Sequence, residues 1–175
     1  SISSIVSNAL GNKSLEKIND LIPQVIWINI VLGFLIYAIT APLATFIFDL
    51  YSAQGEVLNL TASYYQIRAL GFPLTLSAFA IFGIFRGLQN TSWAMIASIS
   101  GAIVNIALDY LLVYGVDGWF EGLGLTGAAI ASLVAQTTML IIALFYFFTK
   151  TPFRIFINQW KPHFLLGQHI KLTAN

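Results

Sequence analysis

The residue most able to do chemistry in this sequence is a single acid inside an apolar stretch. Asp109 is the only charged residue between positions 92 and 115. An ionisable side chain near the centre of a membrane-spanning helix costs at least about 2.5 kcal/mol, so it generally marks a functional site. Desolvation and the negative end of a helix dipole both disfavour the ionised carboxylate. We therefore expect Asp109 to exchange a proton or to bind a small cation.

Asn105 precedes this acid by four residues, which places both side chains on the same face of a helix. Ser98, with Gly101 or Ala102, continues that face as a narrow polar seam. Amide and carboxylate oxygens are hard ligands that suit sodium or a hydrated proton. The spacing therefore predicts a proton or Na⁺ site at Asp109 and Asn105.

A third ligand is predicted from the last apolar stretch. Small residues recur at the start of this stretch and let two helices approach closely: Gly124, Gly127, Ala128, Ala129 and Ala131. Ser132 follows them at a depth of about 10 Å, similar to the depth of about 9 Å estimated for Asp109. Gln136 lies one turn further along the same face. The predicted site thus consists of Asp109, Asn105 and Ser132.

Arg68 is the other charged residue inside an apolar stretch, and it offers a different explanation for the buried acid. A helix that starts near residue 62 would place Arg68 about 9 Å deep, level with Asp109. A structural ion pair would then account for both charges. The two interpretations are compatible, because a basic neighbour would also tune the acid of an ion site.

The elements that must position these residues follow from composition. Hydrophobic residues make up 58% of the 175 residues and charged residues 9%, against roughly a quarter charged in a soluble domain. About 20 apolar residues span a bilayer, and lipid requires every backbone group to be paired within the segment. We predict an all-α polytopic membrane protein in which Pro73 kinks the second span. The predicted spans cover residues 23–48, 62–86, 92–115 and 123–149.

The flanking segments and the loops predict an orientation. Residues 1–22 are interpreted as the end of a preceding helix and a cytoplasmic loop, and residues 150–175 as a cytoplasmic linker and the start of another segment. Basic residues fall in alternate loops, which places both ends in the cytoplasm. We expect a multi-pass protein of the cytoplasmic or inner membrane. These basic residues are Lys13, Lys17, Arg86, Lys150, Arg154, Lys161 and Lys171. Aromatic residues near the span ends agree: Trp27, Trp93 and Trp160 at inner edges, Tyr51, Tyr64, Tyr114 and Trp119 at outer ones.

Several function classes are disfavoured. The formal net charge of +1 carries no sign of a nucleic-acid partner. The two histidines, His163 and His169, stand outside any metalloprotease motif, and the chain has no cysteine. We therefore expect a membrane protein that is not an enzyme and that needs no cofactor other than an ion.

Three motifs, in their order and spacing, carry a family resemblance. FRGLQNT at residues 85–91, NIALDYLLVYG at 105–115 and GLGLTGAAIAS at 122–132 resemble the MATE multidrug and toxic compound extrusion transporters, above all their DinF-like branch. SNALGNKS at residues 7–14 is similar to the inner end of that family's second helix. The resemblance implies that the four spans are the third to sixth helices of an amino-terminal lobe, with the second lobe of the polypeptide missing.

The resemblance also implies a function and a site. It implies an H⁺- or Na⁺-coupled antiporter that exports small organic, cationic or amphipathic drugs and toxic compounds. Asn105 and Asp109 match the family's cation-site pair, whereas Ser132 stands where the family usually has threonine. The partner aspartate of the first helix lies outside this sequence. The alternative is a flippase for lipid-linked precursors. The anionic substrates of such a flippase call for several basic residues along the cavity, and Arg68 is the one basic residue that this sequence offers within a span.

Overall fold

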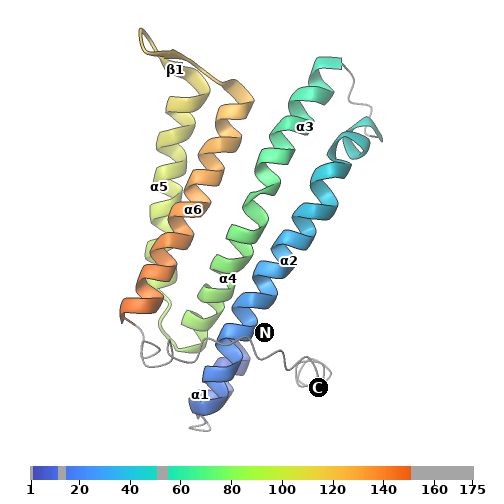
Figure 1. Ribbon diagram of the computed structural model, residues 1–175. Coiled ribbons are helices and arrows are strands. Elements are labelled where there is room, and N and C mark those ends of the chain that lie inside the picture. Colours follow the sequence, from blue (N-terminus) through green and yellow to red (C-terminus); the bar gives the residue numbers. More distant parts are fainter. Residues whose placement is uncertain (1, 12–14, 51–54, 151–175) are drawn as a thin grey trace.

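The computed structural model describes residues 2–11, 15–50 and 55–150. Helices dominate these ranges, and one short antiparallel ladder pairs Gly115 with Glu121 and Val116 with Phe120. In chain order the elements are α1 (Ile2–Gly11), α2 (Leu15–Leu50), α3 (Gly55–Ala69), α4 (Gly71–Gly87), α5 (Ser92–Tyr114), β1 (Gly115–Val116), β2 (Phe120–Glu121) and α6 (Gly124–Lys150) (Figure 1). The sequence did not predict the small ladder, which closes the turn between α5 and α6.

The described residues contain four helical segments that are long and apolar enough to cross a membrane. They run over Ile22–Leu50, Gly55–Gly87, Ser92–Tyr114 and Gly124–Thr149. The all-α, multi-pass membrane fold is therefore confirmed. The second segment differs from its predicted bounds, because its helix begins at Gly55 rather than near residue 62. Its first turns contain Glu56 and Asn59, which interrupt the apolar pattern without ending the helix.

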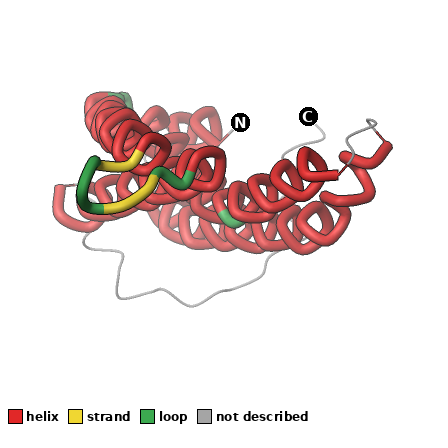
Figure 2. Tube along the Cα trace, turned by 90° about the horizontal axis from the view of Figure 1, so that it is seen from above, coloured by secondary structure: helices red, strands yellow, loops and turns green. Residues whose placement is uncertain are grey.

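α4 lies at the centre of the bundle, with α2 against one side and α6 against the other (Figures 1 and 2). α5 packs chiefly against α6, so it forms the outer helix of that pair. The fully buried side chains with the largest volume are Ile81, Ile84 and Phe85, all from α4. On α5, by contrast, Ile103 and Ile106 are 62% and 71% exposed, as suits a surface that meets lipid or further helices.

The second span is broken at Leu70, between α3 and α4, and Pro73 explains the position of the break. Proline has no backbone N–H, and its ring clashes with the carbonyl four residues earlier, here that of Ala69. The Leu70 N–H instead donates to the Ile67 carbonyl at 3.2 Å, a tighter turn than an α-helix makes. On the other side, a Cβ on Gly33 of α2 would lie 2.8 Å from the Pro73 nitrogen. The break is therefore packed tightly against α2.

α5 and α6 approach each other closely where small residues begin α6. A Cβ placed on Gly127 would lie 2.6 Å from the backbone carbon of Leu112 and 3.1 Å from its Cβ. The Leu123 N–H donates to the Leu112 carbonyl at 2.8 Å, which fixes the register of the two helices. Ala129 and Ala131 are fully buried. Glycine at position 127 therefore permits a backbone contact that any other residue would obstruct.

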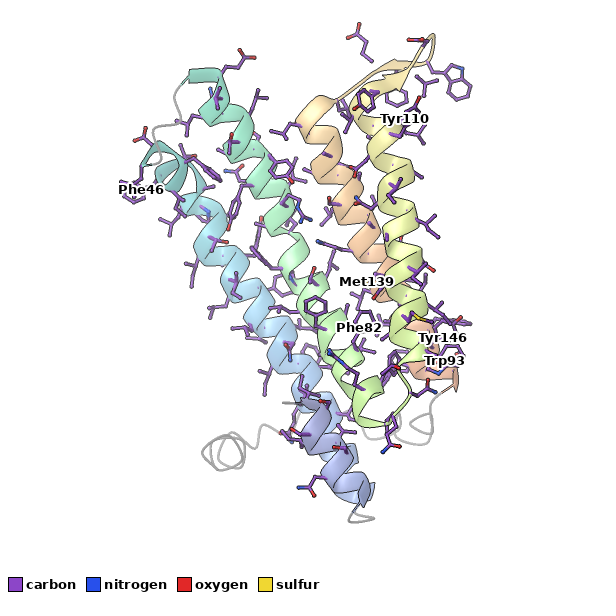
Figure 3. All side chains as sticks on the ribbon, turned by 180° about the vertical axis from the view of Figure 1, so that it is seen from behind. Phe46, Phe82, Trp93, Tyr110, Met139 and Tyr146 are labelled. Atoms are coloured by element: carbon purple, nitrogen blue, oxygen red, sulfur yellow. The ribbon has the colours of Figure 1, made fainter. Side chains whose placement is uncertain are left out.

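Aromatic side chains gather at both ends of the α5 and α6 pair. Trp93 stacks on Tyr146 with ring centroids 4.1 Å apart, at the end of the bundle where α4 meets α5 (Figure 3). Tyr110 and Tyr114 lie toward the opposite end, and Trp119 in the turn beyond them is 90% exposed.

Some residues named in the sequence analysis lie outside the residues that the structure describes. They are Lys13, Tyr51, Arg154, Trp160, Lys161, His163, His169 and Lys171, with most of the 150–175 linker. The side chains of Lys17 and Lys150 also lie outside what the structure describes.

Candidate functional site

Two of the predicted site residues meet across the α5 and α6 pair. The Asn105 amide Nδ2 donates to Ser132 Oγ at 3.5 Å, a long hydrogen bond between partly buried side chains. The contact is possible because the glycine and alanine residues at the start of α6 bring the two helices close together. The amide oxygen of Asn105 and the second lone pair of the Ser132 hydroxyl stay available as acceptors.

A recess of about 230 Å³ opens beside this pair, between α3, α5 and α6. The seam expected on α5 contributes Ser98, Gly101, Ala102 and Asn105. Met139 supplies an apolar wall and lies about midway along the bundle in Figure 3, between the aromatic residues of the two ends. The full lining consists of Arg68, Ser98, Gly101, Ala102, Asn105, Ser132, Ala135, Gln136 and Met139.

Asp109 lies one helical turn from Asn105 toward the end of α5 and is partly buried. Its carboxylate Oδ1 is shielded from solvent and has no hydrogen-bond partner among the described residues. A buried carboxylate oxygen without a partner is costly, and native proteins satisfy nearly all such groups. Asp109 is not among the residues that line the recess. This oxygen is therefore available to a cation or to a hydrogen-bond donor from elsewhere.

Arg68 lies further along its helix than the sequence predicted, because the helix starts earlier. From Gly55 to Arg68 the axis of α3 rises about 20 Å at 1.5 Å per residue, whereas Asp109 lies about 8 Å from the end of α5. The guanidinium Nη1 is buried and, like Asp109 Oδ1, lacks a partner within the described ranges. The proposed ion pair is therefore not formed through these atoms. Arg68 instead shares the recess with Asn105 and Ser132.

Gln136 also lines the recess, although no role was predicted for it from the sequence. Its side-chain Oε1 is buried without a partner in the described part of the chain, and its Cδ would lie 3.0 Å from a Cβ on Gly71. The amide thus packs against the backbone where α4 begins. The signal for its position was present in the sequence, because Gln136 follows Ser132 by one turn on the same face of α6.

Substitution of Ser132 tests whether the Asn105–Ser132 contact contributes to ion binding. We expect Ser132→Ala to weaken the affinity for the cation expected at Asp109 about three- to tenfold, as befits the loss of one neutral hydrogen bond. Ser132→Thr retains the hydroxyl and should remain within about twofold of the unmodified protein. The measurement is the cation concentration that gives half-maximal binding to the purified protein. Equal effects of both substitutions would show that the hydroxyl is not a ligand.

The chain is similar to a known protein family and to two curated proteins. The MatE family model matches residues 1–111, which include Asn105 and Asp109. A "Probable multidrug resistance protein NorM" of Bacillus anthracis is 28% identical over 173 residues, covering 93% of this chain and 38% of that protein. A "Multidrug export protein MepA" of Staphylococcus haemolyticus is 28% identical over 166 residues, covering 94% of this chain and 36% of the relative.

One solved structure is similar over most of the bundle. It is described as the inward-facing conformation of a multidrug resistance MATE family transporter of the MOP superfamily. The TM-score is 0.78 at 25% sequence identity, and the match covers 85% of this chain and 33% of that structure. The chain therefore spans less than two-fifths of the length of the proteins it resembles.

Proposed function

This chain belongs to the MatE family, and from that premise we propose that it forms part of a cation-coupled antiporter that exports small organic, cationic or amphipathic compounds. The names of the relatives, multidrug resistance and multidrug export proteins, support the export of such compounds. The observation that carries the coupling is the buried Asp109 oxygen, which lacks a partner among the described residues one turn from the Asn105–Ser132 contact. The antiporter requires no cofactor beyond its coupling ion.

The proposed mechanism places the coupling ion, H⁺ or Na⁺, at Asp109. A ligand drives a conformational change only by its difference in affinity for the two states. A proton would neutralise the carboxylate, and a sodium ion would draw further oxygen ligands from Asn105 and Ser132. These three side chains do not complete a sodium coordination shell, so the remaining ligands come from water or from other parts of the polypeptide.

The proposed setting is the cytoplasmic membrane. The bundle end that joins α4 to α5, with Arg86 in the last turn of α4, faces the cytoplasm under the positive-inside rule. Both ends of the chain then lie on that side. The partners are the surrounding lipid and a second lobe of the same polypeptide, against which this bundle rocks between inward-open and outward-open states. The flippase alternative receives less support, since Arg68 is the single basic residue that lines the recess.

Reconstitution tests the proposed antiport. The complete transporter would be inserted into dye-loaded vesicles, and dye export would be followed after a proton or a sodium gradient is imposed. We expect one of the two gradients to accelerate export, because the ion and the dye bind to different conformational states of the lobe that contains Asp109. Export at the same rate with either gradient and with none would contradict ion coupling.

A further inference from the structure

We propose that the recess between α3, α5 and α6 binds a carboxylate group of the transported compound, with Arg68 as its principal ligand. The inference deepens the proposed function and rests on it, because it names a chemical feature of the exported substrate. It concerns a different group from Asp109, which does not line the recess.

The first reason is the state of the Arg68 guanidinium. Its Nη1 is buried and has no hydrogen-bond partner among the residues that the structure describes. A buried guanidinium N–H is costly unless a hydrogen-bond acceptor satisfies it. Asp109 does not supply one, as its own Oδ1 is equally without a partner in the same ranges. The guanidinium fork matches a carboxylate in a planar, two-bond geometry, which a lysine ammonium does not reproduce.

The second reason is the composition of the lining. Arg68 is the one charged residue among the nine that line the recess, so its positive charge is not offset there. Ser98 adds a hydroxyl group that can donate to an anion. The positive charge of Arg68 therefore favours an anionic group beside it.

The third reason is the size of the recess and its apolar wall. Met139 offers an apolar contact for the carbon skeleton that adjoins the carboxylate. A volume of about 230 Å³ is below the range of about 300–1,000 Å³ that holds a whole drug, so the recess receives one end of the molecule. Zwitterionic amphipathic compounds fit these requirements.

Two dyes that differ at one group provide the test. Rhodamine 110 carries a free carboxylate, and rhodamine 123 is its methyl ester with the same cationic ring system. Binding of each dye to the purified complete transporter would be measured by fluorescence anisotropy without an ion gradient. We expect Arg68→Gln to weaken rhodamine 110 binding at least about tenfold and rhodamine 123 binding less than about twofold.

Two further variants complete the design. Arg68→Lys retains the charge but loses the planar two-bond geometry of the guanidinium. It should therefore weaken the binding of rhodamine 110 less than Arg68→Gln does, and it should still bind rhodamine 110 more tightly than rhodamine 123. Arg86→Gln is the matched control, because Arg86 lies in the last turn of α4, is exposed and donates from Nε to the Phe82 carbonyl at 3.4 Å. It should leave the binding of both dyes unchanged.

The outcomes separate this proposal from ion coupling. If Arg68→Gln weakens the binding of both dyes equally, or of neither, the proposed carboxylate subsite is wrong, even where gradient-driven export persists. If Arg68→Gln does not fold, Arg68→Lys decides: an unchanged affinity for rhodamine 110, or an equal loss for both dyes, overturns the proposal. Conversely, selective loss of rhodamine 110 supports the subsite whether or not a gradient drives transport, because the measurement is made at equilibrium.

Discussion

Asp109→Asn is expected to abolish gradient-driven export by the complete transporter while the protein still folds and inserts into the membrane. Asparagine has nearly the same shape as aspartate, so packing on α5 is preserved. It cannot take up a proton near neutral pH and carries no charge to attract sodium. Interactions with a charged group contribute about 1.5–3 kcal/mol, so the apparent affinity for the coupling ion should fall at least about tenfold. Export under a gradient should fall to the rate measured without one.

Asp117→Asn is the matched control for this substitution. Asp117 lies in the exposed turn between β1 and β2, outside the helices. Neutralising it changes the net charge of the protein by the same amount without touching the site, so export should stay within about twofold of the unmodified rate. Vesicle export assays on the two variants, at matched protein density, give the comparison. Full gradient-driven export by Asp109→Asn would refute the assignment.

Gly127→Leu is expected to destabilise the bundle more than any other single change considered above. A Cβ at this position would meet the backbone and Cβ of Leu112, and backbone atoms cannot move aside as the tip of a side chain can. Overpacking a filled site costs about 1–3 kcal/mol, and contact with backbone places this case at the upper end. The displacement of α6 would also separate Ser132 from Asn105. We therefore expect both a lower melting temperature and weaker ion binding.

Gly11→Leu is the control for that effect. Gly11 ends α1, and no atom from another part of the described chain lies within 4 Å of a Cβ placed there. Thermal unfolding of the two purified variants in the same detergent should show a clear loss for Gly127→Leu and a change close to zero for Gly11→Leu. Equal melting temperatures for both variants would mean that α5 and α6 are not held together at Gly127.

Much of this architecture could be predicted, because lipid requires every backbone polar group of a membrane span to be hydrogen-bonded within the protein. Long apolar stretches must become helices, and the spacing of Asn105 and Asp109 places them on one face of α5. The small residues before Ser132 indicate where a neighbouring helix approaches. Local sequence therefore predicts the seam of Ser98, Gly101 or Ala102 and Asn105 on α5, together with Ser132 on α6.

The position of Arg68 could not be predicted in the same way. Its depth depends on where α3 begins, and the helix extends through Glu56 and Asn59, which no apolar pattern requires. The direction of the helix that carries Arg68 depends on the break at Leu70. Pro73 imposes this break, because its ring would clash with the carbonyl of Ala69, four residues earlier. The contact of Gln136 with Gly71 joins α6 to α4, two helices that are distant in the sequence. Such positions follow from packing of the whole bundle.

The most direct test of the central assignment, that the coupling ion binds at Asp109, is to count the ions displaced when substrate binds. Rhodamine 123 would be added to the purified complete transporter in weakly buffered solution, and released protons, or displaced radioactive sodium, would be measured. The unmodified protein should release ion in proportion to bound dye, whereas Asp109→Asn should bind dye and release none. Equal release from both proteins would contradict the assignment.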